Sequence, residues 1–138
     1  MFDRLKRLFG SGGSEKFTKV KLFVYFGNEK KPNKFWEFQL RENIGQEGDI
    51  IGVATVGKGY GVDLEVPNRG VSRKHADLVV RQNKDNKIGV NYIDHSSNGS
   101  VVNKQMVKNL SIGLFPGSII KLGLDTEFIE VKFDWKLE

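Results

Sequence analysis

The chain contains no cysteine, so it can form neither a disulfide framework nor a cysteine-based metal site. Only two histidines are present, which is too few for us to expect a transition-metal site. No apolar stretch approaches the roughly 20 residues that span a bilayer, and no signal peptide is recognisable at Met1. We therefore expect a cytoplasmic protein, soluble or at most attached to a surface, without a metal or other cofactor.

Positive charge is concentrated at the N-terminus. The 138 residues carry a net charge of +5 and are enough for one domain with its own core. Residues 1–21 contain six basic and two acidic residues, a net charge of +4, whereas the rest has 16 basic and 15 acidic residues, a net charge of +1. Binding to a polyanion backbone needs many cations on one surface. The nearly neutral body therefore makes nucleic acid an unexpected partner.

Residues 1–9 have the pattern of a short amphipathic helix, and the Gly/Ser-rich residues 10–15 read as a flexible linker. Basic residues occupy one side of this helix, and the other side is apolar, formed by Phe2, Leu5, Leu8 and Phe9. A helix this short is marginal alone in water. It would form on an anionic membrane surface, in a partner's groove or on its own domain, and a frayed tail is the equal alternative.

After the linker, the sequence changes to alternating apolar and polar residues, the pattern of β-strands. We predict strands over residues 17–26, 35–40, 50–56, 76–80, 88–93, 100–102, 118–122 and 128–135. Turn sequences rich in Pro, Asn and Gly separate them, and no long segment has helical periodicity. Residues 16–138 are therefore predicted to be one all-β domain, a sandwich or a barrel, with the many phenylalanines in its core.

Three clusters of polar residues and glycine lie at the ends of predicted strands, over residues 56–63, 70–76 and 94–103. Together they contain cations, hydroxyls and an amide: Lys58, Arg73, Lys74, Ser72, Ser97 and Asn98. A phosphothreonine carries a charge of about −1.5 to −2 and three acceptor oxygens, so it needs a cation and several neutral donors. An Asn side chain can also hold a peptide backbone. The clusters therefore indicate an anion-binding site.

Catalysis is not expected from these clusters, because none places a general base beside a nucleophile. Asp94, His95 and Ser96 are the residue types of a catalytic triad. Neighbours on an extended chain point to opposite faces, however, so His95 should face away from the other two. The residue types suit binding, and we do not expect an enzyme.

Four motifs then resemble, in order and spacing, the signature of the forkhead-associated (FHA) domain family. They are Gly-Lys-x4-Asp, Ser-x-x-His-Ala, Asp-x-Ser-Ser-Asn-Gly-Ser-x-x-Asn and Pro-Gly-x-Ile-Ile-x-Leu-Gly, within roughly residues 35–135. The resemblance implies an antiparallel β-sandwich of the FHA/SMAD-like type with its recognition loops at one end. It also implies a signalling module that binds a phosphothreonine-containing protein or peptide.

The same resemblance implies a role for individual residues. Phosphate would be bound by Lys58, Ser72, Arg73 and Ser97, and the main chain of the peptide by Asn98. Arg69 and Gly70 fall in the loop that selects the residue three beyond phosphothreonine, where an exposed Arg69 would favour an acidic residue. Structural support would come from His75, Gly57, Gly99 and Asn103.

Two features depart from the family pattern. Lys58 stands where the family usually has Arg, and a lysine ammonium lacks the planar fork that binds phosphate through two hydrogen bonds. The alternative function is therefore a degenerate FHA-fold scaffold that binds partners without phosphate and is tethered through residues 1–9. The second departure is a long connection over residues 41–50, expected to lie away from the binding end.

Overall fold

The computed structural model of the chain describes residues 16–138, so the amphipathic segment and linker predicted for residues 1–15 lie outside the described residues. The described part consists of strands and loops. It contains no helix, and so none long and apolar enough to span a membrane.

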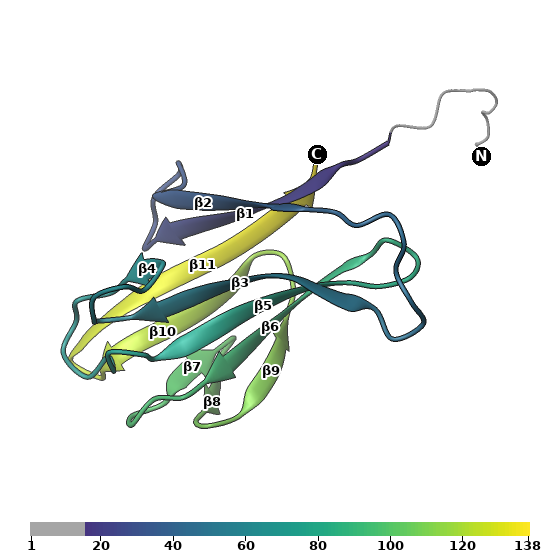
Figure 1. The fold of residues 1–138 in the computed structure, drawn as a ribbon. Coiled ribbons are helices and arrows are strands. Elements are labelled where there is room, and N and C mark those ends of the chain that lie inside the picture. The colour runs from purple at the N-terminus through teal and green to yellow at the C-terminus, as the bar shows by residue number, and fades with distance from the viewer. Residues whose placement is uncertain (1–15) are drawn as a thin grey trace.

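The strands form two sheets that face each other (Figure 1). One has six strands in the order β2 (Lys34–Gln39), β1 (Lys19–Phe26), β11 (Glu127–Leu137), β10 (Ser118–Leu124), β7 (Ser100–Val102) and β8 (Gln105–Val107). The other has five in the order β4 (Leu64–Glu65), β3 (Asp49–Gly57), β5 (Ala76–Gln82), β6 (Ile88–Asp94) and β9 (Ser111–Leu114). The predicted all-β sandwich is confirmed.

The pairings are antiparallel as predicted, except that β3 and β4 run parallel over two residue pairs. All eight predicted strands are present, with ends that shift by at most two residues. The strands β4, β8 and β9 were not predicted; they have two to four residues, and of the strands this short only β7 was predicted. Each is held by the neighbour with which it pairs.

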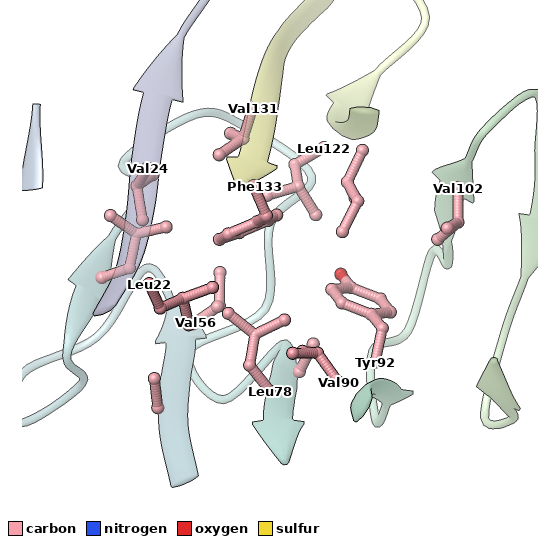
Figure 2. Packing of buried hydrophobic residues seen from close by; sticks show 14 of the residues in the cluster. Leu22, Val24, Val56, Leu78, Val90, Tyr92, Val102, Leu122, Val131 and Phe133 are labelled. Atoms are coloured by element: carbon pink, nitrogen blue, oxygen red, sulfur yellow. The ribbon is translucent and has the colours of Figure 1, made fainter. Parts of the chain in front are cut away.

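The core lies between the two sheets and is built mainly from valine and leucine (Figure 2). Strand alternation sends every second side chain inward, as for Val20, Leu22 and Val24 of β1, and each fully buried side chain stabilises the fold by about 1.5–3 kcal/mol. The prediction that the phenylalanines form the core was wrong for several of them. Phe133 is fully buried, but four are exposed: Phe17, Phe35, Phe115 and Phe128. Position in the pleat, rather than hydrophobicity, decides which side chain is covered.

The strand register brings three loops to the same end of the sandwich. Val56 near the end of β3 pairs with Ala76 at the start of β5, which in turn pairs with Asp94 at the end of β6. The loops that follow β3, precede β5 and follow β6 therefore begin side by side. The connection from β2 to β3 lies at the opposite end, as expected: the backbone N–H of Arg41 donates to the Oε1 atom of Gln82, the last residue of β5.

Candidate functional site

The first two loops are joined by backbone hydrogen bonds where β3 ends. The N–H of Lys58 donates to the carbonyl oxygen of Ser72 at 3.0 Å, and the N–H of Gly59 donates to that of Arg73 at 3.3 Å. The chains approach so closely that a Cβ atom on Gly57 would lie 2.0 Å from the Arg73 carbonyl oxygen. Only glycine fits there, which explains the glycine before Lys58.

The side chain of His75 joins the second loop to the third from beneath. Its Nδ1 atom accepts a hydrogen bond from the N–H of Ser72 at 3.0 Å. Its Nε2 atom lies 3.1 Å from the carbonyl oxygen of Gly99 and 3.0 Å from the Oγ atom of Ser100. Burial lowers the pKa of His75 and outweighs the opposite effects of Asp94 and the Gly99 carbonyl. The ring is therefore neutral, with its proton on Nε2.

Two further hydrogen bonds connect the second and third loops at the surface. The Oγ atom of Ser72 accepts from the N–H of Ser97 at 3.1 Å, which leaves its own hydroxyl hydrogen to donate to a ligand. The Nδ2 atom of Asn98 donates to the carbonyl oxygen of Gly70 at 3.0 Å. This fixes the Asn98 amide, whose oxygen and second hydrogen make no other hydrogen bond within residues 16–138.

Under the third loop, the buried carboxylate of Asp94 organises the turn. It accepts hydrogen bonds from the N–H and hydroxyl of Ser96, the hydroxyl of Ser100 and the N–H of Asn109. Burial by itself would raise the pKa of Asp94, but these hydrogen bonds hold it below its usual value, so the carboxylate is ionised. Ser100 also bonds the hydroxyl of Tyr92, whose pKa burial raises.

Sequence reasoning missed this role of Asp94, although the residue belongs to the motif Asp-x-Ser-Ser-Asn-Gly-Ser. The sequence does not show that Asp94 is buried, and this burial is what lets its carboxylate organise the turn. Ser96 extends the network by accepting the N–H of Gly99 at 2.7 Å. Gly99 has φ +82, and a Cβ atom there would lie 2.8 Å from the Sδ atom of Met106. Met106 of strand β8 and Lys108, which follows that strand, therefore also lie next to the third loop.

The cations of the site are exposed. Lys58, Arg73 and Lys74 carry no ion pair with a carboxylate in the described part of the chain, so their charge is available to an anion. Arg69 differs, because its Nη1 atom lies 3.0 Å from the Oε1 atom of Glu127 at the start of β11. The carbonyl oxygen of Arg69 accepts a hydrogen bond from the N–H of Leu124 at the end of β10, which ties this loop to the six-stranded sheet.

Asn103 is the one predicted site residue that the fold does not bring to these loops. It lies in the turn between β7 and β8 with φ +47. Its Nδ2 atom donates to the Oγ atom of Ser118, and its Oδ1 atom accepts the N–H of Ile119. These bonds tie the β7–β8 turn to the start of β10. Asn103 therefore stabilises a part of the fold that lies away from the anion-binding loops.

The residue types of a catalytic triad do not form a relay. His95 points to the outer side of its sheet, where its Nε2 atom lies 2.9 Å from the Oδ2 atom of Asp77, whereas Asp94 faces inward. Within residues 16–138, no three His, Asp or Glu side chains are grouped closely enough to hold a metal ion. The arrangement instead combines exposed cations with oriented hydroxyl and amide donors on three interlocked loops.

Comparisons with known proteins agree with this geometry. The family model for the FHA domain matches residues 54–123. An engineered FHA domain, solved with a Myc-pTBD peptide, is 19% identical with a TM-score of 0.61, covering 88% of this chain and 94% of that one. The N-terminal FHA domain of S. cerevisiae Rad53p, solved with a phosphothreonine peptide, is 22% identical with a TM-score of 0.59, covering 83% and 93%. Full-length yeast Pml1p is 22% identical with a TM-score of 0.60, covering 86% and 83%.

At these identities, the solved structures establish the fold, and no curated protein matches the chain. The family model is independent of them and covers half of the sequence, including all three loops of the site. The chain therefore belongs to the FHA domain family, a family of phosphothreonine-binding modules.

Proposed function

We propose that this protein binds phosphothreonine-containing segments of partner proteins through the three loops that follow β3, precede β5 and follow β6. The observation that carries the proposal is the hydrogen bond from the Ser97 N–H to the Ser72 Oγ atom at 3.1 Å. It orients the Ser72 hydroxyl so that its hydrogen can point to an acceptor, and it brings two loops to one phosphate.

The predicted residues other than Asn103 take the following roles in this proposal. Lys58 and Arg73 supply positive charge, while Ser72 and Ser97 supply hydroxyl donors for phosphate oxygens. The fixed amide of Asn98 holds the main chain of the peptide. His75, Gly57 and Gly99 keep the loops in place, and Arg69 and Gly70 are assigned to contact the residue three beyond phosphothreonine.

The test is a calorimetric titration with three matched peptides that contain phosphothreonine, phosphoserine or unmodified threonine at one position. We expect strong binding of the phosphothreonine peptide alone. Ser72→Ala should weaken it at least tenfold, because a hydrogen bond to a charged phosphate contributes roughly 1.5–3 kcal/mol. Asn98→Ala should weaken it by roughly two- to tenfold, because a hydrogen bond to the neutral peptide main chain contributes about 0.5–1.5 kcal/mol. Lys84→Ala is the control, since Lys84 lies in the β5–β6 turn at the opposite end and bonds Gln46.

Equal affinity for the three peptides would contradict the proposal and favour a second function, a phosphate-independent scaffold. One observation favours that alternative: Lys58 stands at the position where the family usually has Arg. A scaffold would bind its partner equally well after Ser72→Ala. The same titration therefore separates the two functions.

A further inference from the structure

The outer face of the six-stranded sheet carries outward-pointing aromatic rings on three neighbouring strands, two of them exposed and two half-buried. Because Val24 of β1 and Phe133 of β11 point into the core, the residues next to them in the pleat point outward. The outward rings are Phe23 and Tyr25 of β1, Phe35 of β2 and Phe128 of β11. Phe35 is 50% exposed and Phe128 is 42% exposed, so neither is explained as core.

A lysine ammonium lies over each of these rings. The distances from Nζ to the ring centroid are 4.1 Å from Lys21 to Phe35, 4.5 Å from Lys132 to Tyr25, 4.2 Å from Lys121 to Phe128 and 5.9 Å from Lys136 to Phe23. Phe23 and Phe35 are themselves 6.5 Å apart across β1 and β2. The face thus repeats one unit, an outward-pointing ring with a lysine ammonium over it.

The charges on this face are not all neutralised. Lys19 pairs with Glu37 at 2.9 Å, and Lys136 lies 3.6 Å from Glu138. Within residues 16–138, Lys21, Lys121 and Lys132 make no ion pair, although Glu130 and Asp134 also lie on outward positions of β11. The near-neutral total charge of the body led us not to expect a nucleic acid, but a total does not show where lysines gather.

One ring also borders a hollow. Its lining consists of Tyr25, Gly27, Asn28, Glu29, Lys30, Ile119, Glu130 and Lys132. Its aromatic, apolar and amide groups are of the kinds that receive a planar base with polar edges. Its two lysines and two glutamates balance in charge, so this hollow suits a base rather than the phosphate that accompanies it.

We propose that this sheet face binds single-stranded nucleic acid, independently of the phosphothreonine site. Each nucleotide offers a π-face that stacks on an aromatic ring and a phosphate that attracts a cation, which matches the repeated unit. Phe23 and Tyr25 are two residues apart on one strand, about 6.6 Å, so successive unstacked bases can reach successive rings. Base pairs inside a duplex cannot, because their faces are covered by stacking.

Fluorescence anisotropy with labelled 15-nucleotide oligo(U), oligo(dT) and a duplex of the same length tests this proposal. We expect saturable binding of a single strand and much weaker binding of the duplex. Phe35→Leu and Tyr25→Leu should each weaken binding about tenfold, because they keep an apolar side chain but remove the stacking surface. Phe35→Trp should retain binding. Phe115→Leu is the control, an exposed phenylalanine between β9 and β10 that lies outside this face.

Salt dependence gives a second readout. Lys21→Gln and Lys132→Gln should each reduce the slope of log affinity against log salt by about 0.7.

The proposal is overturned if neither single strand binds, if the duplex binds equally well, or if Phe35→Leu binds like the unmodified protein. Anionic phosphatidylserine vesicles that bind both the unmodified protein and Phe35→Leu, without any oligonucleotide binding, would identify a membrane surface instead. Ser72→Ala should leave oligonucleotide binding unchanged although it weakens phosphopeptide binding. The failure of one proposal can therefore be told apart from the failure of the other.

Discussion

The Nδ1 atom of His75 accepts a hydrogen bond from the backbone N–H of Ser72 at 3.0 Å. The buried His75 ring therefore directly supports Ser72, one of the residues proposed to bind phosphate. Only a neutral imidazole can accept at Nδ1 while its Nε2–H donates toward Gly99 or Ser100. Protonation would turn the acceptor into a donor that faces another donor. The position of Ser72 therefore depends on the charge of a residue that no ligand touches.

We expect the free energy of unfolding to fall as the pH is lowered from 7 to 5. Burial lowers the pKa of His75 in the folded chain below its usual 6.5. The unfolded chain therefore takes up a proton near pH 6.5, while the folded ring stays neutral until a lower pH, and stability is lost between these two values. Urea denaturation between pH 5 and 8 measures the effect. The slope should persist in His95→Gln and disappear in His75→Gln, and its survival in the second variant would contradict our assignment.

Lys58→Arg should tighten phosphopeptide binding by roughly fivefold, because a guanidinium can donate two parallel hydrogen bonds to one phosphate whereas an ammonium acts as a point charge. Isothermal titration of the phosphothreonine peptide measures the change, with Lys84→Arg at the opposite end as control. Unchanged or weaker binding would count against Lys58 as a phosphate contact.

Glu127→Gln should increase the preference for an acidic residue three positions beyond phosphothreonine. The Glu127 carboxylate holds the Arg69 guanidinium at 3.0 Å, and removing its charge frees Arg69 for the peptide. Both side chains are exposed, so we expect a change of only about two- to fivefold. Peptides with Asp or Ala at that position measure it, and Glu130→Gln on the same strand is the control. An unaltered ratio between the two peptides would mean that Arg69 does not face this residue.

Gly57→Ala should destabilise the fold by about 1–3 kcal/mol and weaken phosphopeptide binding, because the added Cβ atom would meet the Arg73 carbonyl oxygen at 2.0 Å. Gly89→Ala is the matched control, since a Cβ atom there meets nothing within 4 Å. Chemical denaturation of both variants compares their free energies of unfolding. Equal stability would show that the β3 end can move away from the second loop without cost.

The order of motifs predicted the fold class and the three loops that come together, because these depend on local patterns that the chain displays directly. Alternation predicts which segments extend, and Gly57 and Gly99 mark places where backbone or neighbouring side chains come close. The expectation that residues 41–50 lie away from the site followed in the same way, from their position outside the motifs.

Several features depended on which segments the fold brings together. The burial of Asp94, the ion pair between Arg69 and Glu127 and the exposure of four phenylalanines arise from contacts between residues distant in the sequence. The sequence determined a two-sheet domain with a cation-, hydroxyl- and amide-bearing end, since side-chain chemistry and strand periodicity are local. Only the tertiary structure decided which hydrogen bonds those groups already make, and which rings and lysines share an open face, because both depend on strand register.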